Sequence, residues 1–280
     1  MVRSHRRSTV LALLVGVAIL AAAVWFLLRP SAGEDKTSSP LDSGQTADGN
    51  VQSLGPPDDA ASAEPDPDQA EAEVHPVDPR LIQPSLPSLQ QSDPTAWSTL
   101  TTLFNPTNVL NLVVQQQLVQ RTVTLIDGLT QAELAPSVSV LRPVPGELRV
   151  AHPAGGQPVI SRINAERYAP YVNAFVAADA HALVRAYRAA YPLFQAAYVE
   201  LGYPQRHFND RLIQVIDHLL QTPAVTASPP VRLNERGHYE WADPALQQRS
   251  IGQKAILRLS PDQANAVKEQ LRHIRAALMS

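Results

Sequence analysis

The sequence predicts a mainly α-helical domain that follows an N-terminal transmembrane helix and a disordered linker. Three observations predict this fold class. Residues 9–28 form an uncharged apolar run, residues 29–91 are rich in Pro, Ser, Ala, Asp and Glu, and residues 92–280 place apolar side chains at helical spacing. The chain therefore divides into a basic cytoplasmic N-terminus at 1–8, a transmembrane helix at 9–28, a linker at 29–91 and a single helical domain at 92–280.

The apolar run, TVLALLVGVAILAAAVWFLL, has the length of a membrane span. With a rise of about 1.5 Å per residue it extends about 30 Å, which is the thickness of the hydrocarbon core of a bilayer. Arg3, Arg6 and Arg7 precede the run, whereas acidic residues soon follow it. The positive-inside rule then keeps the N-terminus in the cytoplasm and places the rest of the chain outside.

A cleaved signal peptide is the alternative interpretation of the same run. Ala21, Ala22 and Ala23 resemble a cleavage site that follows a basic segment and a shorter apolar stretch. The run continues past them to Leu28, and Trp25 lies where an interfacial aromatic residue anchors a span. These features favour a retained membrane anchor, and cleavage would instead release the protein.

The linker is predicted to be disordered because it has few large apolar side chains to bury. A flexible chain of this length reaches roughly 40 to 50 Å. Its charge is strongly negative, since residues 31–79 contain twelve acidic side chains and one basic one. From Arg80 onward, eighteen basic residues outnumber fourteen acidic ones. A solubilising tether is the simpler interpretation; the alternative is that the acidic segment masks a basic surface or repels anionic envelope polymers.

Helix signals follow one another through the domain. The first helix runs from 92 to 104, and the second covers 115–127 and ends at Gly128. A proline-spaced extended region at 136–150 and a Gly155-Gly156 turn precede a helix at 164–177. A long helix is predicted at 179–201, where Pro192 should kink it or divide it in two. Along it, Tyr187, Tyr191, Phe194 and Tyr198 form a stripe that could line a ligand groove but more often packs in a core.

The clearest amphipathic pattern is at 210–221, with Asn209 as the expected N-cap. A short extended piece at 231–241 follows. A capping box of Ser260 and Gln263 then opens the last helix, which runs nearly to the C-terminus. The candidate binding residues are the polar face of the 210–221 helix and two tyrosines of the stripe: Tyr191, Tyr198, Asp210, Arg211, Gln214, Asp217 and His218.

Two long motifs carry a resemblance to a known family. They are YPLFQAAYVELGYPQRHFNDRLIQVIDHLLQTP at 191–223 and YEWADPALQQRSIGQKAILRL at 239–259, and LRPVPGELRV at 141–150 is in the same style. Over about residues 87–278 the chain resembles the proteobacterial domain of unknown function numbered three thousand and fourteen. The resemblance implies a bacterial inner-membrane protein with a periplasmic helical domain, and it implies no catalytic residue.

Motifs for familiar chemistry are missing from the sequence. The absence of cysteine excludes thiol catalysis and Cys-ligated zinc. G-x-S-x-G, H-E-x-x-H and glycine-rich phosphate or dinucleotide loops are missing too, and Ser250 and Lys254 are one residue too far apart for S-x-x-K. We predict no catalytic residue, no metal ligand and no cofactor. Nucleic-acid binding is not expected, because the chain has neither a motif nor a strongly basic face.

Two functional hypotheses remain. In the first, the domain is a non-enzymatic module tethered to the lipid bilayer, and it docks an envelope protein or an envelope polymer. In the second, it is an envelope hydrolase that uses Glu200, Asp210, Asp217 or His218. The first is favoured because no nucleophile, metal or cofactor motif is recognisable. Convergence of those four side chains in a closed cleft would revive the second.

Overall fold

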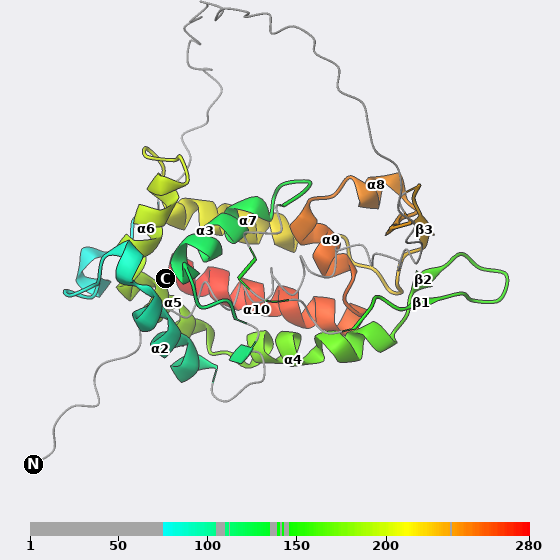
Figure 1. Cartoon of the computed structure of the whole chain (residues 1–280), viewed down its shortest axis with the longest axis horizontal. Helices are drawn as coiled ribbons and strands as arrows, with labels where there is room; N and C mark the ends of the chain where they lie inside the picture. Colours follow the sequence, from blue (N-terminus) through cyan, green and yellow to red (C-terminus); the bar gives the residue numbers. More distant parts are fainter. Residues whose placement is uncertain are drawn as a thin grey trace, which may run out of the picture. The chain divides into compact units, whose positions relative to one another are not determined.

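The computed structural model describes residues 75–104, 110–111, 113–134, 139–140, 142, 146–235 and 237–280. This part is mainly helical, with 57% helix and 6% strand, as the sequence predicts (Figure 1). The predicted transmembrane helix at 9–28 and the linker up to residue 74 lie outside the described residues. Within the described ranges, no helix combines the length and the apolarity needed to cross a membrane.

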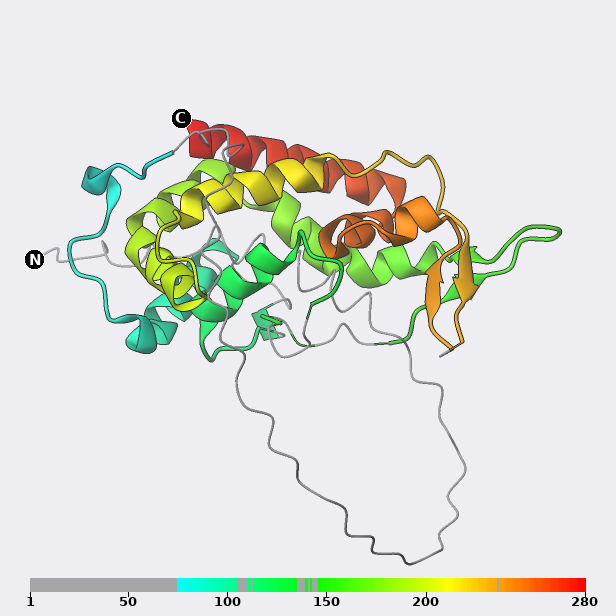
Figure 2. The same cartoon turned by 90° about the horizontal axis from the view of Figure 1, so that it is seen from above.

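The C-terminal helix α10 (Pro261–Met279) is the centre of the packing. It contacts α4 (Ile163–Ala177), α5 (Ala180–Ala189) and α7 (Phe208–Leu220). Figure 2 shows α7 running alongside α10. Val267, Leu271 and Ile274 recur on one face of α10 and are fully buried, so this face forms a spine of the core.

The predicted long helix is divided in two, as Pro192 requires. Helix α5 ends at Ala189, and α6 (Tyr191–Glu200) begins one residue after Ala190. Proline has no amide hydrogen and its ring clashes with the preceding turn, so it fits only in the first turn of the new helix. The aromatic stripe is mostly core: Tyr187, Phe194 and Tyr198 are at most 1% exposed.

Helix α3 (Leu118–Gly128) begins three residues later than predicted. Its N-cap Gln117 has a left-handed backbone, with φ of 54°. Asp93, at the start of α2 (Asp93–Leu103), accepts hydrogen bonds from the backbone N–H groups of Gln117 and Leu118, both at 2.8 Å. A carboxylate from a neighbouring helix thus sets the start of α3, and periodicity within α3 could not reveal it.

Helix α7 begins at Phe208, two residues before the predicted start, and its N-cap is His207 rather than Asn209. The backbone N–H of Phe208 donates to Oε1 of Gln195 on α6, at 2.9 Å. Phe208 is fully buried and contacts the rings of Phe194 and Tyr198. Burial of this ring and a cap supplied by α6 therefore extend the helix, and Asn209 lies inside it.

Two short antiparallel hairpins lie beside the helices. Strand β1 (Val150–Ala151) pairs with β2 (Val159–Ile160), and β3 (Val231–Leu233) pairs with β4 (Tyr239–Trp241). A small second core joins them to helix α9 (Ile251–Leu257), which follows the one-turn helix α8 (Pro244–Gln247). The buried members of this core are Ile160, Val231, Trp241 and Leu257.

The end of the predicted linker is packed on the domain. Residues 75–91 contain the 3-10 turns η1 (Pro79–Leu81) and η2 (Leu89–Gln91), and Leu89 is buried. The backbone N–H of Gln83 donates to the carbonyl oxygen of Ala189 at 2.9 Å, at the C-terminal end of α5. Residues 75–91, which the sequence assigns to the linker, therefore contact the helical domain, and these contacts satisfy backbone groups that composition alone does not reveal.

Candidate functional site

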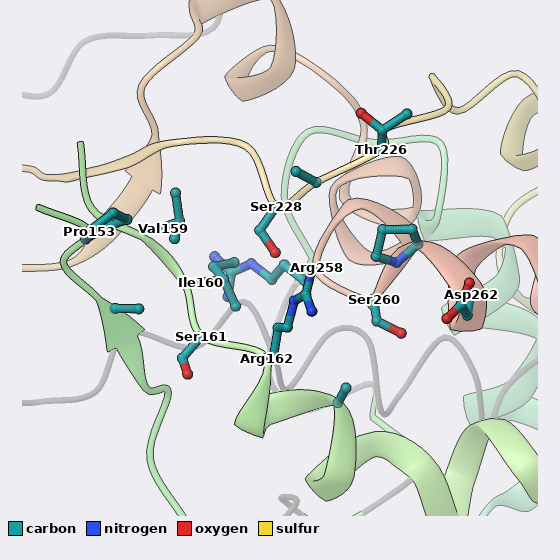
Figure 3. Close-up of a pocket in the computed structure, with 14 residues that line it drawn as sticks. Pro153, Val159, Ile160, Ser161, Arg162, Thr226, Ser228, Arg258, Ser260 and Asp262 are labelled. Atoms are coloured by element: carbon teal, nitrogen blue, oxygen red, sulfur yellow. The ribbon is translucent and has the colours of Figure 1, made fainter. Parts of the chain in front are cut away.

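A pocket of about 760 Å³, partly open to solvent, lies where four segments meet. Its walls are the β1–β2 hairpin, the start of α4, residues 226–228, and the junction of α9 with α10 (Figure 3). Pockets of this size hold small organic ligands. Its polar lining consists of two arginines, four hydroxyl residues and one carboxylate: Arg162, Arg258, Ser161, Thr226, Ser228, Ser260 and Asp262.

Two helices begin at this pocket. Arg162 is the N-cap of α4, and Ser260 is the N-cap of α10. The predicted capping box is confirmed, because Ser260 Oγ accepts from the backbone N–H of Gln263 and Gln263 Oε1 accepts from that of Ser260, both at 3.3 Å. Helix N-termini carry partial positive charge, so their placement favours an anion in the pocket.

Arg258, the residue that ends α9, is half-buried in the pocket wall. Its Nε atom is buried and has no hydrogen-bond partner in the described part of the chain. No described carboxylate forms an ion pair with it. Burial lowers the pKa of Arg258 to about 10, so the guanidinium still carries its charge at neutral pH.

Arg162, at the start of α4, supplies a second guanidinium. It is exposed, and no described acidic side chain pairs with it. Figure 3 shows both arginine side chains reaching into the pocket, with the hydroxyl of Ser228 pointing toward them and Asp262 set apart on α10. Two guanidinium groups with adjacent hydroxyls are suited to charge-assisted hydrogen bonds with an oxyanion.

The seven binding residues predicted from the sequence lie elsewhere, and none lines this pocket. Tyr198 is 1% exposed and belongs to the core. Tyr191 is half-buried and its hydroxyl donates to Oε1 of Gln195 at 2.9 Å; burial raises its pKa to about 12. The two tyrosines therefore serve packing between α6 and its neighbours in this structure.

The charged residues at the start of α7 are engaged by other parts of the domain. Asp210 Oδ1 accepts from the backbone N–H of His75 at 2.7 Å and lies 3.3 Å from its Nδ1. Arg211 forms a largely buried ion pair with Asp127 at the end of α3, with 2.6 Å between Nε and Oδ1. It also donates to Thr130 Oγ1 at 2.7 Å. These contacts join α7 to the segment before η1 and to α3.

The remaining polar residues of α7 have different surroundings. Asp217 forms a two-bond ion pair with Arg275 of α10, and Gln214 is exposed. His218 Nε2 lies 2.7 Å from Ser250 Oγ. Burial and the charges of Arg211 and Arg249 lower the pKa of His218.

None of the four side chains of the hydrolase hypothesis lines the arginine pocket. Glu200 is exposed on α6 and accepts from Gln90, whereas Asp210, Asp217 and His218 have the separate partners given above. No described group of three His, Asp or Glu residues could hold a metal ion. The closest approach to a catalytic pair is His218 with Ser250, but the Ser250 hydroxyl caps α9 and the residue is only 7% exposed.

Sequence reasoning missed Arg162 and Arg258. Arg258 lies two residues before the Ser260 capping box, and that motif marks it as a residue at a helix junction. The pocket itself joins residues from Ala151 to Asp262, and their proximity arises only when α4 and α10 pack together. No spacing motif connects such distant positions.

The fold and the pocket define the described part as a mainly helical domain with an arginine-lined cavity. Its sequence matches the family described as protein of unknown function (DUF3014) over residues 118–275, so the chain belongs to this family. The match confirms the resemblance found in the sequence, and it includes every residue that lines the pocket. Comparisons with curated proteins and with solved structures found no match.

Proposed function

We propose that this protein is a membrane-tethered, non-enzymatic binding module of the bacterial cell envelope, whose helical domain binds an anionic ligand between Arg162 and Arg258. Residues 9–28 span the inner membrane once, with the N-terminus in the cytoplasm and the helical domain in the periplasm. The apolar run and the arginines before it support this placement. The acidic linker lets the domain reach ligands away from the membrane surface.

Arg258 is the observation that carries the proposal. A half-buried guanidinium whose Nε has no partner is costly for a folded protein, because desolvation is not repaid by a hydrogen bond or an ion pair. A ligand oxyanion beside the guanidinium supplies the missing ion pair. An unpaired charged group of this kind reduces stability, so its presence is expected where the residue serves ligand binding.

A non-enzymatic role agrees with the distribution of acid–base groups. The pocket lining contains no histidine, no tyrosine and no lysine among the described residues, and its one carboxylate, Asp262, is exposed. The pocket can therefore hold charge and donate hydrogen bonds, but it lacks a positioned general base. An envelope protein or polymer that carries the anionic group is the expected partner.

Ligand binding by the full chain in a non-ionic detergent tests the proposal. Thermal unfolding is measured with phosphate, sulfate, citrate or acetate at constant ionic strength. We expect at least one anion to raise the Tm of the wild type, and we expect the rise to be lost in Arg162→Gln and Arg258→Gln. Arg185→Gln, an exposed arginine on α5, is the matched control. An equal response in the pocket variants and in the control would refute the proposal.

A further inference from the structure

We infer that the ligand of the arginine pocket is a sugar phosphate, held with its phosphate between Arg162 and Arg258 and its hydroxyls toward Asp262. This inference rests on the proposed anion-binding function and specifies its ligand. It follows from three properties of the pocket: its charge, its arrangement of donors and acceptors, and the composition of its walls.

The charge of the pocket favours a dianion. Two guanidinium groups reach into it, and no described carboxylate pairs with either. A carboxylate ligand carries one charge and would leave one of the two arginines uncompensated. A phosphate monoester carries about −1.5 to −2 at neutral pH and offers three terminal oxygens. The positive N-termini of α4 and α10 act in the same direction.

The donors near the arginines suit a phosphate group. Ser228 directs its hydroxyl toward the two arginine side chains (Figure 3). Each guanidinium presents a planar fork of N–H donors that matches two phosphate oxygens. The hydroxyls of Ser161 and Ser260 accept from backbone N–H groups at the two helix starts, and each keeps a proton that it can donate.

A sugar on the ligand would explain why the pocket lining contains a carboxylate, Asp262. Asp262 is exposed in the first turn of α10 and set apart from the arginines in Figure 3. A carboxylate accepts hydrogen bonds from hydroxyl groups, so it can bind the sugar without facing the phosphate. A ligand that consisted of phosphate alone would gain nothing from this residue, and most of the 760 Å³ would stay empty.

The walls of the pocket disfavour a nucleotide. Its apolar lining is aliphatic, from Ala151, Pro153, Val159 and Ile160 of the β1–β2 hairpin and from Ala165 of α4. No aromatic side chain lines it within the described residues, whereas protein sites for nucleobases commonly stack the base on an aromatic ring. The volume of the pocket is sufficient for a hexose, and the polar lining can bind its hydroxyl groups.

Calorimetry on the full chain in non-ionic detergent tests the inference with four soluble probes: glucose 6-phosphate, glucuronate, glucose and inorganic phosphate. We expect glucose 6-phosphate to bind at least about tenfold more tightly than each of the others. Arg162→Gln and Arg258→Gln should each weaken its binding by about tenfold or more, and Arg185→Gln should not. Asp262→Asn should weaken the binding of glucose 6-phosphate and leave the binding of inorganic phosphate unchanged.

Circular dichroism checks that each variant is folded. If the Arg258 variant fails to fold, the Arg162 variant still tests the inference, because Arg162 is exposed.

The outcomes separate this inference from the proposed function. Equal or tighter binding of glucuronate, with loss in the arginine variants, would overturn the sugar-phosphate assignment and leave anion binding standing. Binding of no anion would overturn both. Vesicles with phosphatidic acid present a phosphate monoester on a lipid, and phosphatidylcholine vesicles are the control. If only the phosphatidic acid vesicles compete with glucose 6-phosphate, the phosphate belongs to a lipid headgroup and the sugar-phosphate assignment is refuted.

Discussion

The side chain of Gln263 donates a hydrogen bond from Nε2 to the carbonyl oxygen of Ala165 at 2.8 Å. Its Oε1 also accepts from the backbone of Ser260 in the capping box. One side chain therefore caps α10 and ties its first turn to the first turn of α4. Because Arg162 is the N-cap of α4 and Arg258 lies two residues before the N-cap of α10, this contact helps to set the distance between the two guanidinium groups.

Gln263→Ala should lower the free energy of unfolding by about 1 to 2 kcal/mol, because it removes half of the capping box and the bond to α4. Urea unfolding measures the change. Gln214→Ala, at an exposed position on α7, is the control and should stay within about 0.5 kcal/mol of the wild type. The same loss in both variants would show that Gln263 has no special role in helix packing.

Arg211→Ala should be much more damaging than Arg275→Ala. The pair of Arg211 and Asp127 is largely buried, with side chains 19% and 13% exposed, so truncation leaves a desolvated carboxylate. We expect a loss of about 2 to 4 kcal/mol. Asp217 and Arg275 are each 38% exposed, and their pair should contribute about 0 to 1 kcal/mol. Urea unfolding measures the loss of unfolding free energy in both variants. A larger loss in Arg275→Ala than in Arg211→Ala would contradict the role of burial.

The stability of the folded domain should fall as the pH drops below about 6.5, in part because of His218. Burial, followed by the charges of Arg211 and Arg249, lowers the pKa of His218 from 6.5 in the folded state. The unfolded chain then binds this proton at a higher pH, so the stability is complete above the unfolded pKa and is lost as the pH falls through the folded pKa.

His218→Gln should reduce this acid-induced loss, measured as the urea midpoint between about pH 7 and pH 5. His181→Gln, an exposed histidine on α5, controls for the removal of an imidazole elsewhere. If His218→Gln and the wild type lose stability equally over this range, another group accounts for the pH dependence.

Arg258→Met should stabilise the ligand-free protein by about 1 kcal/mol while it abolishes anion binding. Methionine keeps the apolar contacts of the arginine stem and removes a half-buried charge that has no described ionic partner. Thermal unfolding without added anions measures the change. A marked loss of stability would instead indicate that Arg258 is needed for the fold.

Membrane topology can be checked with reporters fused after Pro79. A reporter that is active only outside the cytoplasm should be active there, and a cytoplasm-specific reporter should not, because the proposed orientation, based on the arginines before residues 9–28, has the N-terminus inside. The opposite pattern would reverse the orientation. The mass of the mature protein distinguishes a retained anchor from cleavage near Ala21, Ala22 and Ala23, since only cleavage removes the N-terminal segment.

Local signals predicted much of the helical framework. The break at Pro192 and the capping box of Ser260 and Gln263 occur where expected, because each depends on residues within one turn of the chain. The starts of α3 and α7 were wrong by two or three residues. Asp93 sets the first and Gln195 the second, and both act from another helix.

The sequence by itself determined the helical class of the domain, the family to which the chain belongs and the boundaries of several helices, and it predicts the membrane anchor; it did not predict α8 or α9. Only the tertiary structure decided where the charged residues lie. It placed Asp210, Arg211 and Asp217 in contacts between elements, and it brought Arg162 and Arg258 to one pocket. Helical periodicity records which face of an element is apolar, whereas a pocket depends on which elements meet, and that is determined by packing between residues distant in the chain.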